Sequence, residues 1–323
     1  MNERVSQQQT DSPAASRHKA KRPIPKIDYS QPAGAAALFA VDSLHWHVFK
    51  NPVSLFIGGI AAVLLELAEE RVRTGVWEHS IFPTDPITRL RRTGIAAHVS
   101  VYAPAAVAQK MIAGVVAMHS RVEGRTPRGT PYRANDAELL DWVQCTVSYG
   151  FMEAYAAYCR PLTDAQRDRF YEESQASSRL FLAQRAPRSV SEQRQQFAAM
   201  EPHLEAHPIV FEFLEIMLRT PAVPFVFRPL QRVMLRAGID MLPPWVIERI
   251  ELGGREWRLK DSERRFLKRL GALFERIPIP YSPPVIASRR MGLPGNYLYR
   301  RRAWSQATLR AGKEWAASVE CDR

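Results

Sequence analysis

Apolar residues recur along most of this chain with the roughly 3.6-residue period of an α-helix, and no series of short alternating segments predicts a sheet. The longest apolar run, VSLFIGGIAAVLL at 53–65, has 13 residues. It is shorter than the roughly 20 residues that span a bilayer. We therefore expect no transmembrane segment here, but a buried helix over about 54–74 with a charged second half.

Capping residues mark where the next helices begin and end. Asp85 followed by Pro86 is typical of a helix start and predicts a helix that runs to about Tyr102. Pro104 begins a further helix, which Gly124 closes. The segment RTPRGTPYRAND that follows is expected to form a loop because of its glycine and proline content.

The second half of the chain continues the helical pattern. Asn135 and Glu138 resemble a capping arrangement that opens a long helix, and another helix follows Thr163. Helical periodicity returns at 191–200, 209–218 and 262–277. The last of these segments has one apolar face, made of Phe266, Leu267, Leu270, Leu273 and Phe274.

These segments predict an all-α fold, a single large domain of many helices over about 35–288. Residues 1–34 are polar, proline-rich and basic, which is typical of a disordered tail. Residues 289–323 form a basic extension that we expect to be irregular. The N-terminus lacks the apolar core of a secretory signal, so we expect a cytoplasmic protein.

The charge balance is basic, with 45 Lys and Arg against 33 Asp and Glu, a net charge of +12 over 323 residues. Much of the excess lies in SRHKAKRPIPK near the start and RRMGLPGNYLYRRR near the end. Such arms attract acidic partners in general and indicate no specific nucleic acid. They also allow a peripheral contact with a membrane surface.

The three cysteines, Cys145, Cys159 and Cys321, form no CxxC pair, which indicates reduced thiols and fits a cytoplasmic location. The absence of CxxCH excludes a covalently attached c-type haem. The chain also lacks HExxH, GxSxG, GxGxxG, a P-loop and the paired motif of zinc deaminases. His45 and His47 are two residues apart, a spacing that does not place both on one helical face.

Two segments remain as candidates for chemistry. Arg89 and Thr93 are four residues apart and share a helical face with small residues, either as a solvated first turn or as a cofactor face. His119 lies on a stripe of aliphatic residues, as a hydrogen-bonded core histidine or as a ligand. Neutral imidazole suits iron, and one axial histidine is enough for haem b.

An acidic cluster precedes these two segments. Glu66, Glu69 and Glu70 lie beside Arg71 and Arg73. Such a cluster is usually the solvated, salt-bridged end of a helix. If that end faced a pocket, one carboxylate could act as a base.

Several separated stretches together resemble the MpaB-like oxygenase family, which includes rubber oxygenase, also called latex-clearing protein. They are LLELAEERVRTGVWEHSIFPTDPITRLRRTG, MHSRVEG, PYRANDAELLDWV and FMEAY, and the resemblance covers about residues 45–250. It implies an all-α fold. From the latex-clearing members it also implies a non-covalent b-type haem, used with dioxygen to cleave carbon–carbon double bonds.

The resemblance also assigns roles to individual residues. The family's Arg-x-x-x-Thr element falls on Arg89 and Thr93, which would lie close to the haem, and its proximal iron ligand falls on His119. A distal lysine of the family is replaced by Arg92, which stays protonated and is a poor ligand. The catalytic carboxylate falls nearest to Glu69.

Two positions depart from the family pattern. Gln144 stands where a histidine is expected in the WVH element, and Ala103 replaces the usual glycine after VY. The function predicted is a haem b-dependent oxygenase that acts with dioxygen on a small hydrophobic, unsaturated substrate. The alternative is a non-catalytic helical protein of the same fold that binds haem or another ligand, and Gln144 and Arg92 favour it.

Overall fold

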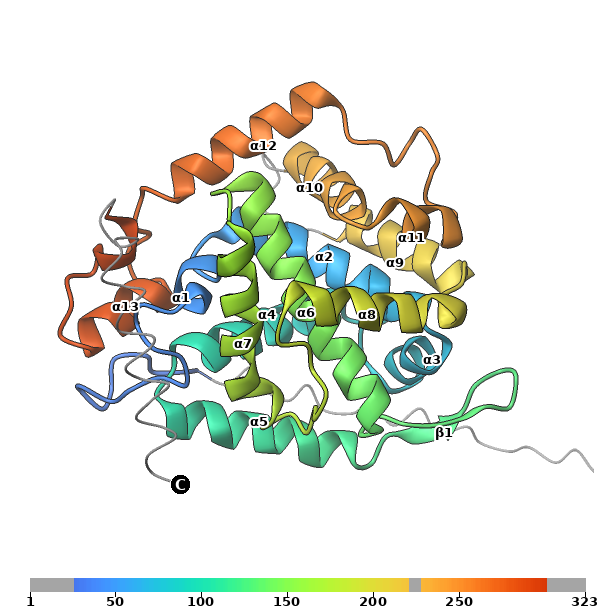
Figure 1. Ribbon diagram of the computed structural model, residues 1–323, viewed down its shortest axis with the longest axis horizontal. Helices are drawn as coiled ribbons and strands as arrows, with labels where there is room; N and C mark the ends of the chain where they lie inside the picture. Colours follow the sequence, from blue (N-terminus) through green and yellow to red (C-terminus); the bar gives the residue numbers. More distant parts are fainter. Residues whose placement is uncertain (1–25, 221–227, 301–323) are drawn as a thin grey trace, which may run out of the picture.

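The computed structural model describes residues 26–220 and 228–300, and over these residues the fold is all-α, as predicted (Figure 1). The helices are α1 (Leu44–Val48), α2 (Pro52–Ala68), α3 (Glu70–His79), α4 (Pro86–Tyr102), α5 (Ala105–His119), α6 (Ala137–Tyr158), α7 (Asp164–Ser178), α8 (Val190–Met200), α9 (Pro208–Arg219), α10 (Arg228–Asp240), α11 (Pro244–Arg249), α12 (Asp261–Phe274) and α13 (Pro283–Arg290). Two short 3₁₀ helices, η1 (Glu201–His203) and η3 (Tyr297–Tyr299), and one small hairpin complete the described part.

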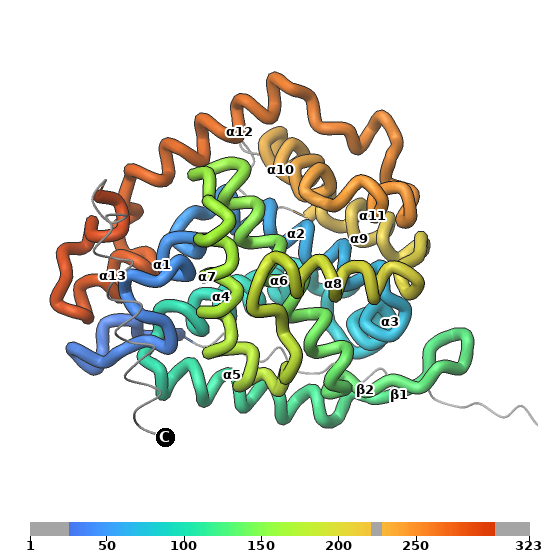
Figure 2. The backbone as a smooth tube through the Cα atoms, viewed as in Figure 1, coloured from blue at the N-terminus to red at the C-terminus, as the bar shows by residue number. Residues whose placement is uncertain are grey.

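The centre of the fold is the pair of helices α2 and α6, which pack closely along their length (Figure 2). Two glycines make this approach feasible. A Cβ atom at Gly58 would lie 2.5 Å from the carbonyl oxygen of Gly150, so the two backbones touch directly. The neighbouring α10 reaches α2 in a similar way, because a Cβ at Gly238 would lie 2.7 Å from the Cβ of Ile60.

The other helices surround this pair. α10 and α9 cover one side of α2, α12 crosses both central helices, and α7 packs against α1 and α6. α4 and α5 pack on each other as a separate layer. In Figure 1, α5 lies at the lower edge of the molecule and α12 at the upper edge.

The contact at Gly58 predicts a large effect of a small substitution. Gly58→Ala should lower the free energy of unfolding by about 1–3 kcal/mol, because the new methyl group meets backbone atoms that cannot move aside. Gly59→Ala is the matched control, since its Cβ would meet only the Phe151 ring at 3.9 Å. It should be neutral or stabilising by up to about 1 kcal/mol. Equal losses in thermal unfolding would contradict this account of the contact.

Two helix boundaries differ from those predicted. The helix expected over 54–74 is broken at Glu69, whose extended backbone (φ −89°, ψ 129°) separates α2 from α3. The helix expected to close at Gly124 ends at His119, and the chain continues into a hairpin of β1 (Glu123–Arg125) and β2 (Pro131–Arg133). The Tyr132 ring lies over Gly124, so a side chain there would collide with it.

Segments on both sides of the expected domain pack onto it. The Arg290 guanidinium donates to the carbonyl oxygens of Ala35 and Tyr29, at 2.9 and 2.8 Å. Leu298 is buried, and its carbonyl oxygen accepts from Lys50 Nζ at 2.7 Å. The helical body therefore includes residues 26–34 and 289–300 besides 35–288. The outer parts of the two expected tails lie outside the described residues.

The apolar face predicted for 262–277 is only partly buried. Leu267 is fully buried and Gly271 touches the Tyr158 carbonyl oxygen of α6. Phe266 and Leu273, in contrast, are about half exposed. The apolar face is therefore wider than the line along which α12 contacts the body, and its Phe266 and Leu273 side lies at the surface.

Candidate functional site

Polar side chains from four helices approach one another between the α4–α5 layer and the central pair. They are Glu66 of α2, Arg89 with Thr93 of α4, His119 of α5 and Thr146 of α6. The charge of Arg89 acts on both Glu66 and His119, so its guanidinium lies between α2 and α5. The site therefore joins segments that are far apart in the sequence.

The start of α4 places Arg89 in this position. Asp85 caps the helix: its Oδ1 accepts from the Thr88 backbone N–H at 3.2 Å and its Oδ2 from the Thr88 hydroxyl at 2.9 Å. Pro86 occupies the first turn, where a missing N–H costs nothing. The helix start predicted from the sequence is confirmed, and it sets Arg89 in the first turn of α4.

Arg89 and Thr93 share one face of α4, as their spacing predicts. The Arg89 guanidinium donates to the Thr93 hydroxyl, which itself donates to the Arg89 carbonyl oxygen at 3.0 Å. Thr93 is exposed, and Ala96 and Ser100 farther along the same face are only half-buried. No large side chain of α4 fills the space in front of this face.

Glu66 is the carboxylate of the site. The Thr146 hydroxyl lies 3.4 Å from its Oε1 and can donate to it. Burial raises the pKa of Glu66 to about 7, and the charge of Arg89 and the bond from Thr146 partly oppose that rise. A carboxyl group with this pKa is present in both protonation states near neutral pH, as a catalytic acid or base requires.

His119 lies on the inner face of α5 with Ala108 and Ile112, both fully buried. Its pKa is lowered by burial and by the positive charge of Arg89, so the imidazole is neutral near pH 7. The ring is half-buried, and its nitrogens have no hydrogen-bond partner among residues 26–220 and 228–300. A neutral imidazole without a partner can ligate a metal ion or accept a proton.

Glu69, the carboxylate singled out in the sequence, has a different environment. It is buried, its Oε2 accepts from the Val72 N–H at 2.7 Å, and its Oε1 pairs with Arg71 Nε at 2.7 Å. Both oxygens therefore stabilise the start of α3. The neighbouring Glu66 faces Arg89 instead. Glu66 belongs to the acidic cluster noted in the sequence, but the resemblance pointed to Glu69 within that cluster.

Arg92 and Gln144 lie at the margins of this cluster. The charge of Arg92 reaches Arg89 and contributes to lowering the Arg89 pKa, after the larger effect of burial. Gln144 accepts a hydrogen bond from the Ser178 hydroxyl at 3.4 Å, so it joins α6 to α7. The departure at Gln144 thus lies in a helix contact. Thr146, two residues farther on, was not singled out in the sequence.

The side chains present at this site distinguish between a bare metal ion and haem iron. Over the described residues, no group of three or more His, Cys, Asp and Glu side chains could hold a bare metal ion. Haem iron needs only one protein ligand, because the porphyrin supplies four nitrogens. One unpartnered imidazole, one arginine to balance the acidic edge of the ring and the small, partly exposed residues Thr93, Ala96 and Ser100 on one face of α4 fit haem.

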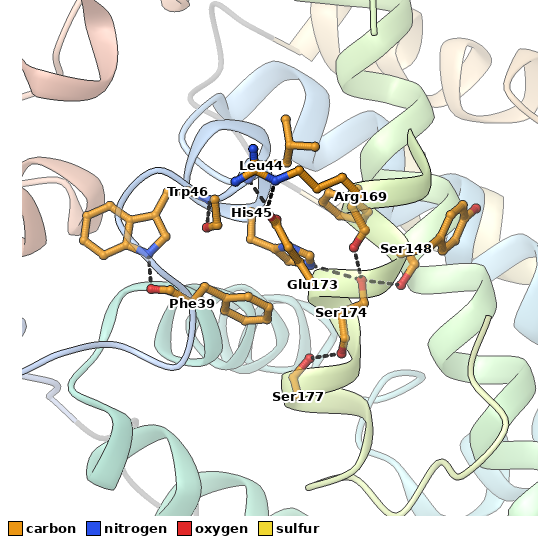
Figure 3. Close-up of polar contacts among 12 residues, drawn as sticks. Phe39, Leu44, His45, Trp46, Ser148, Arg169, Glu173, Ser174 and Ser177 are labelled. Carbon is orange, nitrogen blue, oxygen red and sulfur yellow. Dashed lines mark hydrogen bonds and ion pairs between the residues drawn. The ribbon is translucent and has the colours of Figure 1, made fainter. Parts of the chain in front are cut away.

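A second polar cluster, drawn in Figure 3, has the order of a catalytic triad. Glu173 Oε2 lies 3.2 Å from His45 Nδ1, and His45 Nε2 lies 3.1 Å from the Ser174 hydroxyl. The His45 ring is stacked between Phe39 and Phe170, with centroids at 4.1 and 4.0 Å. His45 and Ser174 are both buried, so no substrate can reach them. The cluster joins α1 to α7 and is structural.

The fold and the site together define an all-α protein with a cluster of polar side chains between the α4–α5 layer and the central pair of helices. The chain belongs to the family described as ER-bound oxygenase mpaB/B'/rubber oxygenase, catalytic domain, which matches residues 46–276. The resemblance found in the sequence is thereby confirmed, and the protein is a member of an oxygenase family. Comparison with curated proteins and with solved structures gave no match.

The matched range covers every residue of this cluster of polar side chains, from Glu66 to Thr146. It extends from α1 to just beyond α12 and leaves out α13 and η3. Within residues 26–220 and 228–300, none of the helices combines the length and apolar character that crossing a membrane requires.

Proposed function

We propose that this protein is a haem b-dependent oxygenase that uses dioxygen to oxidise a small, hydrophobic, unsaturated substrate. The observation that carries the proposal is the neutral, unpartnered imidazole of His119 beside Arg89. Membership of an oxygenase family supports the reaction class. The unpaired thiols of Cys145 and Cys159 are in line with the proposed cytoplasmic location.

Three residues would hold the cofactor. His119 would ligate the iron, Arg89 would balance a carboxylate at the edge of the ring, and Thr93 would donate a hydrogen bond. When bound, haem supplies the chemistry of dioxygen activation. Ile112 and Ala108, two and three turns before His119 on the same face of α5, are buried and hold this face of the helix against the body.

Glu66 would move the proton. As a carboxylate it would accept, at Oε1 or Oε2, a proton from a substrate carbon next to the double bond, while the electron pair of the broken C–H bond passes to dioxygen, the co-substrate. Thr146 orients the group through its hydroxyl, and Arg89 stabilises the carboxylate form before the transfer. Arg92 keeps its proton and contributes positive charge rather than a ligand.

The proposal is tested by absorption spectroscopy and by oxygen uptake. The purified full-length chain, mixed with haem b, should show a Soret band and should bind carbon monoxide after reduction. The reconstituted protein should consume oxygen with small unsaturated lipids or terpenoids. A chain that takes up no haem would overturn the proposal. Haem uptake without oxygen consumption across such a panel would instead favour a non-catalytic haem-binding protein.

A positive charge on α4 should affect haem retention at position 89 but not at position 91. Arg89→Leu should weaken haem retention by about 10–100-fold, the usual effect of removing a group that supports a metal centre. Arg91→Leu removes the same charge about 200° around the helix. Arg91 is exposed, and its removal should change haem retention little. Equal losses for the two variants in a haem-transfer assay would mean that only the net charge matters.

A further inference from the structure

The outer side of α12 is an apolar stripe. Phe266 is 51% exposed and Leu273 is 50% exposed, about two turns apart on the same face of the helix. Leu267 and Gly271, about 100° and 140° around the helix from Phe266, hold α12 against the body. Figure 1 shows α12 along the outer edge of the molecule. Its exposed face therefore points away from the rest of the protein.

The stripe continues beyond the end of the helix. Ile277 and Ile279 are exposed, and Tyr281 is 84% exposed. Tyr281 has a φ of +63°, a backbone conformation that is uncommon for a residue with a bulky side chain. Large apolar side chains so close together on a surface usually mark an interaction site.

Basic residues flank the stripe. Arg265 and Arg269 lie along one side of the stripe, and Arg276 follows the end of the helix. All three are exposed, and none of them forms an ion pair with another described residue. Arg264, one residue before Arg265, is in contrast paired with Asp240 at 2.6 Å. Most acidic groups of this helix are already engaged. Glu263 pairs with Arg236 at 2.5 Å, so the outer face of α12 keeps an excess of positive charge.

A cavity of about 220 Å³ opens where α12 ends. Its lining includes Lys50, Arg160, Arg276 and Arg300, and its one carboxylate is Glu275. Glu275 is paired with Lys50 at 3.0 Å. It also accepts from the Tyr155 hydroxyl at 2.8 Å. The remaining positive charge of the cavity suits an anion of the size of a phosphate group.

We propose that α12 and the loop after it attach this protein to a membrane surface that contains anionic lipids. The apolar stripe inserts among the lipid headgroups, and Arg265 and Arg269 contact their negative charges. The cavity that Arg276 lines accepts the phosphate of one headgroup. A second copy of the chain is a poorer occupant, because it would bring two sets of unpaired cations together.

The test is flotation of the full-length protein with large unilamellar vesicles. Binding is expected with vesicles of phosphatidylcholine and phosphatidylserine, and it should weaken as salt concentration rises. With phosphatidylcholine alone, binding should be weak. Arg265→Glu/Arg269→Glu should reduce the partition coefficient by at least about 25-fold, since each basic residue contributes about fivefold. Phe266→Ser/Leu273→Ser should reduce it by at least about tenfold.

Matched controls keep the proposal falsifiable. Arg121→Glu/Arg125→Glu makes the same charge change beside the hairpin, at the opposite edge of the molecule, and should reduce binding much less than the pair on α12. Leu182→Ser removes another exposed leucine and should leave binding unchanged. Circular dichroism and thermal unfolding of each variant exclude misfolding as the cause of a loss.

Three outcomes would overturn the proposal. One is no binding of the wild type to anionic vesicles. Another is binding that survives both α12 variants and disappears when residues 301–323 are removed, which would place the contact in the C-terminal arm. The third is a wild-type dimer in sedimentation that Phe266→Ser/Leu273→Ser converts to a monomer, which would make the stripe an interface between copies. None of these measurements needs haem, so the test is independent of the proposed oxygenase activity.

Discussion

His119→Ala is expected to lose haem almost completely, while the polypeptide stays folded. The imidazole is half-buried and has no bond to a described residue, so its removal breaks no hydrogen bond within that part of the fold. The loss of haem affinity should exceed the roughly 10–100-fold effect of losing a group that only supports a ligand. Added imidazole should restore a Soret band by entering the vacated space.

Two other histidines are controls for this prediction. His98 Nδ1 lies 2.8 Å from the Gly94 carbonyl oxygen of its own helix, and His79 Nε2 lies 3.1 Å from the Tyr132 hydroxyl. His98→Ala and His79→Ala should therefore retain the Soret band. Full haem occupancy in His119→Ala, measured by the pyridine haemochrome, would remove the ligand assignment.

Glu66→Gln is expected to lower the rate of substrate oxidation by about 10²–10⁴-fold, the usual contribution of a general base. Because burial raises the pKa of Glu66 to about 7, the wild-type rate should rise with pH through that value as the carboxylate forms. The amide cannot titrate, so this limb of the pH profile should be absent in Glu66→Gln. A retained limb near pH 7 would assign it to another group.

Glu66→Gln should lower activity but should not lower the stability of the fold above neutral pH. A carboxyl group whose pKa is raised on folding stabilises the protein fully below about pH 4.5, and this contribution is lost as pH rises through about 7. Glu66→Gln should therefore be at least as stable as the wild type at pH 8. Glu69→Gln is the matched control. It should destabilise the fold by about 1 kcal/mol through its cap on α3 and leave the pH profile unchanged.

The sequence predicted the fold best where residues next to one another in the chain determine the local structure. The start of α4 follows from Asp85 and Pro86, and both the cap and the helix end at Tyr102 are observed. The break at Glu69 was missed because the residues around it favour a helix. It depends on a distant segment, since Glu69 pairs with Leu204 in an isolated bridge.

The candidate site was only half predictable for the same reason. The spacing of Arg89 and Thr93 within one helix predicted that they share a face, and the two side chains are observed in contact there. The pairing of Glu66 with Thr146 joins residues 80 positions apart and depends on how α2 crosses α6. A sequence pattern reports which side chains share a face of one helix, but not which face of another helix they meet. For the same reason, the sequence did not show which side of α12 would be exposed.

The glycine contact between α2 and α6 lies on the same helices as the carboxyl group of the site. Gly150 meets Ala62 and Gly58, and Thr146 meets Glu66 one turn farther along the antiparallel pair. A methyl group at Gly58 would spread the helices and lengthen the bond from Thr146, which helps to keep the pKa of Glu66 low. Mutations that change the packing at this crossing should therefore also shift the pKa of Glu66, and with it the pH dependence of the proposed reaction.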